Sequence, residues 1–249
     1  MLKNKSALIT GANRGIGFSI LERIAENGAN IIACARKQDD LFEKKISNIS
    51  KKFNIKIKPI YFDLSNENEI EQGLKKIISL NWIIDIIVNN AGILKVGKAE
   101  EFSIKDFQDI LQVNVLAPFQ IISGIVGGMK RKKFGRIVNI SSIWGEKSKS
   151  GRSIYSTSKA ALNALTRSFA VEFAEHNILV NSIAPGYIET DMMKQYNSEK
   201  ELDIIKNSIP MKRFGKKTEI SELVKFLCSE KNSYITGQIL TIDGGFACK

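Results

Sequence analysis

The fold of this chain is decided by the turn Thr10-Gly11-Ala12-Asn13-Arg14-Gly15-Ile16-Gly17, which directly follows an apolar run and opens an amphipathic segment. Glycine supplies the backbone angles of such a turn, and its missing side chain lets a pyrophosphate approach the N–H groups of a helix N-terminus. The spacing G-x-x-x-G-x-G differs from the G-x-G-x-x-G of the standard fingerprint. In this strand–turn–helix context it still indicates a dinucleotide-binding turn.

Outward from this turn, short apolar runs alternate with amphipathic segments along the whole chain. Runs that are apolar at nearly every position are typical of strands buried on both faces, as in a parallel sheet. The runs span residues 7–10, 31–35, 55–62, 83–88, 137–140, 178–183 and 239–242. We therefore expect an α/β fold: a single-domain Rossmann-type doubly wound parallel sheet of about seven strands, with helices on both faces, over residues 1–249.

Several of the intervening helices have recognisable beginnings. Ser65 precedes a segment with acidic residues in its first turn, and Ser103 is followed three residues later by Asp106. Acidic side chains are favourable there because the helix dipole is positive at the N-terminus. Further helices are predicted over residues 15–27, 152–176 and 218–229.

Composition limits the classes of function. The 249 residues are 43% hydrophobic and 25% charged, which is typical of a globular protein. Three cysteines without a C-x-x-C pair argue against a disulfide framework or a metal site. We see no signal peptide and no apolar stretch of about 18 residues, so we expect a cytoplasmic protein with no membrane partner. The net charge of +11 comes from dispersed lysines without interleaved aromatics, which does not favour nucleic-acid binding.

The second apolar run indicates which dinucleotide is bound. An Asp or Glu at its end would hydrogen-bond the 2′-hydroxyl of an adenosine ribose, but the run ends in Ala35-Arg36. Arg36 and Arg14 are instead two guanidinium groups, which suit a 2′-phosphate. The sequence therefore predicts NADP(H), preferred over NAD(H).

One stretch, residues 185–217, is long and irregular between the sixth apolar run and the last long helix, with at most a short helix near residues 202–207. Compact domains rarely keep such a loop without a use. We expect it to form a lid over the substrate.

A tyrosine and a lysine carry the candidate chemistry. In Tyr155-Ser156-Thr157-Ser158-Lys159 the spacing of four puts both side chains on one helix face. A nearby ammonium and an oxidised nicotinamide would lower the pKa of the phenol from its ordinary value near 10. Ser142 lies at the end of the fifth strand, at the edge where doubly wound sheets bind ligands.

A set of motifs thus runs in order along the chain: Thr10 to Gly17, Asn89-Asn90-Ala91-Gly92, Asn114, Ser142, Tyr155, Lys159 and Pro185-Gly186. Together they resemble the classical short-chain dehydrogenase/reductase (SDR) family, with a match from Lys5 to Gly245. The segments from Pro185 to Met192 and from Tyr234 to Gly245 are similar to those of 3-oxoacyl-acyl-carrier-protein reductases within that family.

The resemblance implies that NADPH passes a hydride to a carbonyl carbon while Tyr155 protonates the oxygen. Ser142 would hydrogen-bond the substrate oxygen, Lys159 would bind the nicotinamide ribose and tune Tyr155, and Asn114 would hold a water that links Lys159 to solvent. Trp144 and Tyr187 are expected to contact the substrate, together with Ser142. The expected cofactor contacts are Gly11, Asn13, Arg14, Gly15, Ile16, Gly17, Arg36, Asp63, Leu64, Asn90, Ala91, Gly92, Tyr155, Lys159, Pro185, Gly186, Ile188 and Thr190.

The substrate stays open among several carbonyl compounds. The resemblance favours a 3-oxoacyl thioester of a carrier protein or coenzyme A, and the basic cluster from Met129 to Arg136 suits an acidic carrier. The second basic site of such enzymes is His176 here, which is neutral near pH 7. Trp144, Glu146 and Lys149 make the substrate side bulky and polar, which suits a sugar, nucleotide-sugar or other polar ketone. A catalytically silent NADP(H)-binding sensor is the third hypothesis.

Other catalytic patterns in the chain are incomplete. The S-x-x-K of Ser156 to Lys159 lacks the S-D-N and K-T-G motifs that accompany it in penicillin-recognising enzymes. Gly92 to Ala99 approaches a P-loop, but Ala99 replaces the Ser or Thr that holds magnesium. His176 is the only histidine and lies about twenty residues beyond Tyr155, which argues against a Ser-His-Asp triad.

The resemblance to the short-chain dehydrogenase/reductase family also implies that the protein forms a homotetramer or homodimer.

Overall fold

A single parallel sheet forms the centre of the molecule. The computed structural model describes residues 1–190, 193, 196 and 198–248. All strand pairs are parallel and the strand order is β3-β2-β1-β4-β5-β6-β7, which confirms the predicted doubly wound sheet. The strands are β1 Ser6–Thr10, β2 Asn30–Ala35, β3 Ile57–Tyr61, β4 Ile86–Asn89, β5 Gly135–Ile140, β6 Ile178–Pro185 and β7 Ile239–Ile242.

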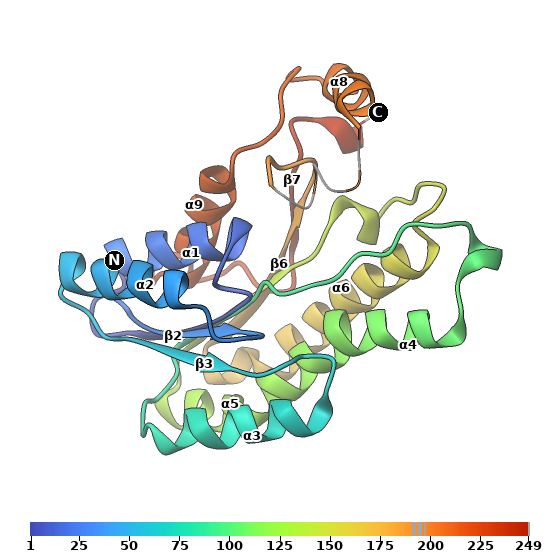
Figure 1. Ribbon diagram of the computed structural model, residues 1–249. Coiled ribbons are helices and arrows are strands. Elements are labelled where there is room, and N and C mark those ends of the chain that lie inside the picture. Colours follow the sequence, from blue (N-terminus) through green and yellow to red (C-terminus); the bar gives the residue numbers. More distant parts are fainter. Residues whose placement is uncertain (191–192, 194–195, 197, 249) are drawn as a thin grey trace.

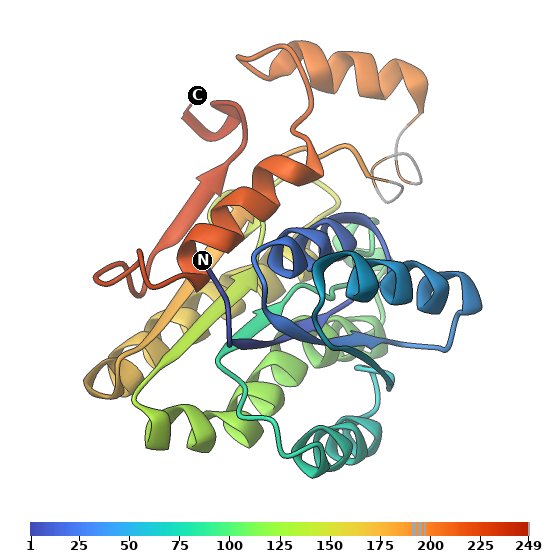
Figure 2. The ribbon, with the colours of Figure 1, turned by 90° about the vertical axis from the view of Figure 1, so that its left-hand side faces the viewer.

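Helices cover both faces of this sheet (Figure 1). Helices α1, α2 and α9 pack on one face, and α3, α5 and α6 pack on the other, as the view turned by 90° also shows (Figure 2). The helices are α1 Gly15–Glu26, α2 Asp40–Phe53, α3 Glu67–Ser79, α4 Ile104–Leu111, α5 Ala117–Lys132, α6 Ser153–Phe173, α8 Glu199–Ser208 and α9 Lys217–Cys228.

Local capping explains where these helices begin. Ser103 caps α4 in the predicted capping box, since its hydroxyl accepts from the Asp106 backbone N–H while the Asp106 carboxylate accepts from the Ser103 N–H. The expected start of α3 at Ser65 is wrong by one residue, because Asn66 supplies the capping side chain. Ser65 instead donates its hydroxyl and its backbone N–H to Asp63.

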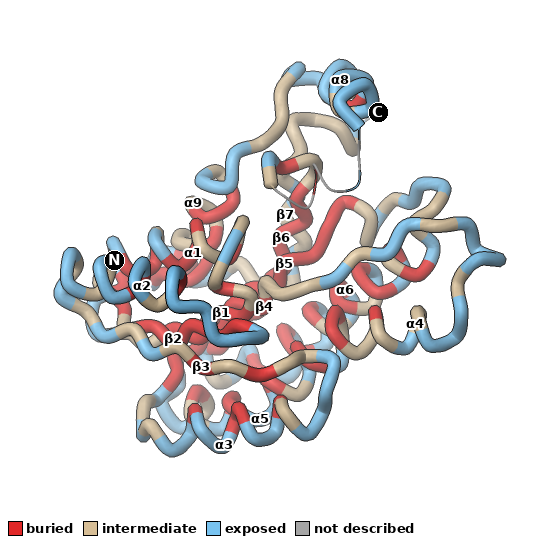
Figure 3. Tube along the Cα trace, in the orientation of Figure 1, coloured by how far each residue is buried: buried red, intermediate tan, exposed pale blue. Residues whose placement is uncertain are grey.

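Two apolar clusters, one on each side of the sheet, make up the core (Figure 3). Ile9, Val88 and Val138 belong to the first cluster, and their strand neighbours Leu8, Ile87 and Ile137 belong to the second. This alternation follows from the period of two along a strand, and burial on both faces explains the nearly continuous apolar runs.

One helical segment of the described chain, Ile104–Lys132, is long and apolar enough to span a membrane by length and composition. Half of its most apolar window is buried inside the protein, where α5 contacts α3 and β5. That burial is typical of the core helix of a folded domain. A π-helical turn, Gln112–Leu116, widens the segment between α4 and α5, and such turns often occur at functional sites.

The segment 185–217 carries α8 away from the sheet, and most of α8 is exposed (Figure 3). Helix α8 is the short helix that was expected near residues 202–207, and it is somewhat longer than expected. Ser198 caps it in a capping box with Glu201. The residues 191, 192, 194, 195 and 197 of the expected lid lie outside the described residues.

Candidate active site

The candidate site lies where the carboxyl ends of the four central strands meet. Strands β1, β4, β5 and β6 end at Thr10, Asn89, Ile140 and Pro185. The glycine turn, the Asn90 segment, Ser142 and Gly186 come at or just after these ends, whereas Asn114, Tyr155 and Lys159 come from helical segments. The chain runs outward from β1 to β3 and then returns to place β4 on the other side of β1. Ligands of doubly wound sheets bind at such a switch point.

Hydrogen bonds lock the glycine turn to the end of β4. The Thr10 hydroxyl accepts from the backbone N–H groups of Asn90 and Ala91 at 3.0 and 3.1 Å. The Asn90 side-chain amide donates back to the carbonyls of Thr10 and Gly11 at 3.0 and 3.2 Å. Asn90 and Ala91 are therefore structural partners of the turn, and Thr10 is a site residue that the sequence interpretation did not single out.

Three glycines shape this turn as a cradle. A Cβ at Gly17 would lie only 2.1 Å from the Gly11 carbonyl oxygen, so the first helix starts closer to β1 than any side chain allows. Gly11 and Gly15 have φ values of +62° and +58°, in the left-handed region that favours glycine. A Cβ at Gly15 would meet nothing within 4 Å, which leaves open space beside the helix end.

The N-terminus of α1 has the electrostatics of an anion site. Its cap residue Arg14 makes no side-chain capping hydrogen bond, and no acidic residue occupies the first turn. The first N–H groups of a helix need a partner and carry partial positive charge. The open cradle and these unpaired donors fit a pyrophosphate, with the backbone around Asn13 and Ile16 forming its rim.

The two arginines that are predicted to bind the 2′-phosphate of the cofactor are exposed. Along the chain, each of them comes shortly after the carboxyl end of a strand, β1 or β2. Arg14 and Arg36 make no salt bridge with any residue that the structure describes. Asp63 is held by Ser65, and the Leu64 carbonyl accepts from the Gln112 amide at 3.3 Å. These contacts fix the loop after β3 beside the π-helical turn.

Ser142, Tyr155 and Lys159 come together from two neighbouring elements. Ser142 lies two residues after the end of β5. Its hydroxyl accepts from the Trp144 N–H at 3.2 Å and shares a hydrogen bond with the Tyr155 phenol. Tyr155 lies in the first turn of α6. One turn further on, the Lys159 ammonium donates to the carbonyl of Ile140 at 2.9 Å and lies 5.8 Å from the centre of the Tyr155 ring.

Burial dominates the titration of both groups. It raises the pKa of the Tyr155 phenol, although the hydrogen bond with Ser142 and the Arg152 cation act in the opposite direction. Burial also lowers the pKa of Lys159 to about 8. The Lys159 ammonium is directed at the Ile140 carbonyl, and the expected acidification of Tyr155 by Lys159 and an oxidised nicotinamide stays a prediction. A raised pKa favours the protonated phenol, which is the state of a proton donor.

Asn114 lies in the π-helical turn and is fully buried beside Lys159. Its side chain accepts from the Ile93 N–H at 2.9 Å and donates to the Ile93 carbonyl and the Ser158 hydroxyl, both at 3.0 Å. A Cβ at Gly92 would lie 3.2 Å from the Asn114 side-chain oxygen and 3.4 Å from the Lys159 nitrogen. The side chain of Asn114 therefore positions the chain after β4, and Gly92 keeps Asn114 and Lys159 close together.

Three aromatic rings form a wall next to Ser142. Trp144 packs edge-to-face on Tyr187 with ring centres 6.3 Å apart, and both pack on Phe246 at 6.0 and 5.3 Å. Trp144 and Tyr187 were expected near the substrate, whereas Phe246 was missed. It lies near the chain end without any local motif, so only the packing of the β7 end against this edge reveals it.

The loop after β6 completes this edge of the sheet. Gly186 donates to the Ile242 carbonyl at 2.8 Å, and a Cβ there would lie 2.6 Å from the Asp243 side chain, so only glycine fits between β6 and β7. Ile188 is buried, and the Thr190 hydroxyl accepts from the Met193 N–H at 3.3 Å. Pro185 ends β6 at this point.

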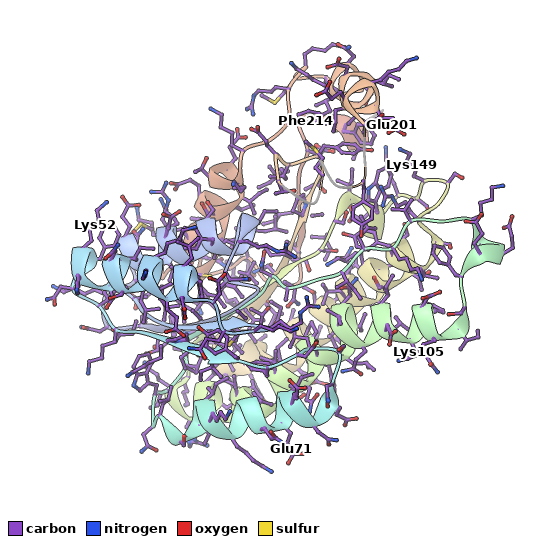
Figure 4. The ribbon with its side chains drawn as sticks, in the orientation of Figure 1. Lys52, Glu71, Lys105, Lys149, Glu201 and Phe214 are labelled. Carbon is purple, nitrogen blue, oxygen red and sulfur yellow. The ribbon has the colours of Figure 1, made fainter. Side chains whose placement is uncertain are left out.

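The segment 185–217 reaches across to two other loops. The Tyr196 hydroxyl donates to the Leu94 carbonyl after β4 at 3.0 Å. The pKa of Glu201 on α8 is lowered mainly by hydrogen bonds from Ser198 and, to a smaller extent, by the Lys149 cation. Figure 4 shows Lys149 on the loop before α6 and Glu201 on α8 above it. The segment thus lies on the side of the molecule that carries Ser142 and Trp144.

Comparisons with known proteins show the family to which the chain belongs. A family model described as enoyl-(acyl carrier protein) reductase matches residues 11–247. The 3-oxoacyl-(acyl-carrier-protein) reductase FabG of Aquifex aeolicus strain VF5 is 38% identical over 244 residues, which cover 98% of each chain. These matches show that the chain belongs to the SDR family, and it is an oxidoreductase of that family acting on alcohol or ketone groups.

Solved structures give the same fold with varied substrates. A gluconate 5-dehydrogenase of Burkholderia cenocepacia J2315, in complex with NADP and tartrate, is 27% identical with a TM-score of 0.91 over 100% of this chain and 97% of that one. A short-chain type dehydrogenase/reductase of Mycobacterium marinum is 33% identical with the same TM-score over 100% and 97%. The family membership therefore sets the reaction class and leaves the substrate undecided.

The close approach at Gly17 provides a first test. In Gly17→Ala the added Cβ would meet the Gly11 oxygen at 2.1 Å and the Asn90 amide at 2.4 Å, so the turn must open. We expect NADPH to bind at least about tenfold more weakly in a fluorescence titration, because the cradle loses its shape. Gly127→Ala is the matched control, since its Cβ would meet only the Arg131 side chain at 3.7 Å. Unchanged affinity in folded Gly17→Ala would contradict the cradle.

Proposed function

We propose that this protein is an NADPH-dependent reductase that converts a carbonyl group to an alcohol. The observation that carries the proposal is the hydrogen bond between Tyr155 and Ser142 at the carboxyl edge of the sheet, next to the buried Lys159. Two hydroxyl groups that converge in this way can both reach one carbonyl oxygen. Because every group of the expected constellation is present, a catalytically silent NADP(H) sensor is the weaker hypothesis.

The proposed roles follow from these positions. The bound cofactor supplies a hydride to the carbonyl carbon. Tyr155 donates its phenolic proton to the carbonyl oxygen, and Ser142 donates a hydrogen bond to that oxygen as negative charge develops on it. Lys159, tied to β5, offers its remaining N–H donors to the ribose side of the site. Asn114 acts on Lys159 through Gly92 and the loop at Ile93, as a positioning residue.

The cofactor-binding residues are proposed from the same edge. The backbone of Gly11 to Gly17 would hold the pyrophosphate, and Asp63 with Leu64 would contact the adenine. Ala91 and Gly92 would line the cofactor beside Tyr155 and Lys159. Ile188 and Thr190, after Pro185 and Gly186, would hold the carboxamide.

Two substrate classes remain for this reaction. The FabG relative supports a 3-oxoacyl thioester, carried by coenzyme A or by an acidic carrier protein near the basic cluster from Met129 to Arg136. A sugar-derived or other polar ketone is the second candidate. It is supported by the aromatic wall of Trp144, Tyr187 and Phe246 and by the gluconate 5-dehydrogenase neighbour. The segment 185–217 would act as the lid over either one, in one domain spanning residues 1–249.

We place the protein in the cytoplasm, where its thiols stay reduced. All three cysteines are free, with Cys34 and Cys228 buried and Cys248 exposed. We propose small molecules and copies of this chain as its partners, and no nucleic acid or membrane.

The proton-transfer role is tested at Tyr155. In Tyr155→Phe we expect NADPH affinity to stay within about twofold and carbonyl reduction to fall at least about 100-fold, since only the donated proton is lost. Because burial raises the phenol pKa, the wild-type protein should reduce carbonyls at neutral pH and oxidise alcohols faster as the pH rises. Stopped-flow and steady-state assays with a panel of carbonyl compounds measure the loss in Tyr155→Phe and the pH dependence of the wild-type protein. Turnover retained by Tyr155→Phe would refute this role.

The cofactor preference is tested at the two free arginines. Replacing Arg14 and Arg36 together by Ala should weaken NADPH binding by at least about tenfold and leave NADH binding unchanged, because only NADPH carries the 2′-phosphate. Arg36→Asp should further favour NADH. Lys52→Ala at the far end of α2 (Figure 4) is the control for net charge. Equal loss for both cofactors would show that the arginines do not read the phosphate.

The assembly is tested in solution. Val171 on α6 and Tyr234 before β7 are 82% and 96% exposed, and Phe119 on α5 is also exposed. Large exposed apolar side chains suit a contact between subunits. We expect light scattering to give a homodimer or homotetramer, and Val171→Lys to shift the mass downward. A wild-type monomer at micromolar concentration would contradict this assembly.

A further inference from the structure

In the part of the chain that the structure describes, one cation beside the candidate active site has buried nitrogen atoms without a hydrogen-bond partner. Arg152 is the N-cap residue of α6, three residues before Tyr155. Its Nε and Nη1 atoms are buried and make no hydrogen bond. Among the residues that the structure describes, none forms a salt bridge with its guanidinium. Buried charged donors normally have partners, so this arginine requires an explanation.

Arg152 stands at the start of α6, one helical turn before the proposed proton donor Tyr155. Its positive charge acts on the phenols of both Tyr155 and Tyr187, which come from α6 and from the loop after β6. Tyr187 is itself in ring contact with Trp144 and Phe246. The charge of Arg152 therefore acts on a residue expected to contact the substrate as well as on the proton donor.

Other arginines of the chain show how this protein satisfies a buried or structural guanidinium. Arg136 is buried and donates to the carbonyls of Gly135, Asn177 and Asn232 at 2.8 to 3.0 Å. Arg213 makes two hydrogen bonds to the Glu219 carboxylate, at 2.9 and 2.7 Å. Arg152 has no corresponding set of acceptors, so its role in holding the fold together is small.

The backbone at the N-terminus of α6 adds partial positive charge next to the Arg152 guanidinium. The first turn of α6 contains no acidic residue, and Arg152 makes no side-chain capping bond. An anion that enters here meets the guanidinium and the positive end of a 21-residue helix together.

We propose that Arg152 binds an anionic group of the substrate, so that the protein acts on carbonyl compounds that carry a carboxylate or phosphate a few atoms from the C=O group. A guanidinium presents several N–H donors in a plane that matches the oxygens of either group. The inference rests on the proposed carbonyl reduction and selects the polar-ketone candidate, because a 3-oxoacyl thioester has no charge close to its ketone. Arg152 is then the specificity-determining residue of the site.

The experiment compares charged substrates with neutral partners of the same shape. Oxo acids with one to four carbons between ketone and carboxylate are assayed beside their methyl esters, and dihydroxyacetone phosphate beside dihydroxyacetone, each with NADPH. We expect kcat/KM of the wild-type protein to be at least about tenfold higher for one acid or for the phosphate. Arg152→Gln should remove that preference, so that each charged compound and its neutral partner are reduced with kcat/KM values within about twofold of one another. The surface variant Lys76→Gln on α3 is the matched control for charge.

The outcomes separate this inference from the proposed function. Reduction of neutral ketones or esters without any preference for the acids overturns the role of Arg152 and leaves the reductase intact. An equal loss for charged and neutral substrates in Arg152→Gln also overturns it. If no carbonyl compound is turned over, the proposed function fails. Thermal-shift titration of the NADP⁺ complex with the same acids then tests whether Arg152 binds an anion. Stabilisation by an acid that is lost in Arg152→Gln supports the anion site, and its absence refutes it.

Discussion

The hydrogen bond from the Lys159 ammonium to the Ile140 carbonyl is the contact on which the candidate site depends. It joins α6 to the last residue of β5 and so fixes where Tyr155, one helical turn earlier, stands relative to Ser142. Gly145 allows the segment after β5 to approach α6 closely, since a Cβ at this position would lie 2.9 Å from the Lys159 backbone. A buried amine needs such an acceptor, since desolvation of the ammonium is otherwise costly. The same contact therefore stabilises the fold and arranges the chemistry.

Desolvation has opposite effects on the groups that meet there. It favours the neutral form of each, raising the pKa of the phenol and lowering that of the amine to about 8. The phenol is thereby kept as a loaded acid, which suits reduction. Arg152 adds a positive charge that lowers the pKa of the phenol and so opposes the effect of burial.

The sequence predicted the fold closely because parallel strands buried on both faces leave apolar runs that need no partner information to recognise. It also predicted which residues follow the strand ends, since the family motifs are local in the chain. It could not predict the hydrogen bond of Lys159 to the Ile140 carbonyl, because spacing places Lys159 on the right helix face without saying where its nitrogen points. Phe246 and the Thr10 hydroxyl bond were missed for a similar reason: both act through contacts between distant segments.

Arg152 illustrates why residue type alone does not identify a functional charge. Arg136 and Arg152 both carry buried guanidinium nitrogens, Arg136 within β5 and Arg152 at the N-cap of α6. Arg136 has backbone carbonyls around it, at the amino end of β5, where the charge serves to tie Asn177 and Asn232 together. Arg152 stands near the opposite end of the sheet, beside two phenols that accept no bond from it. Because removing a cation from water without acceptors is unfavourable, the position is best explained by an anion that arrives with the substrate.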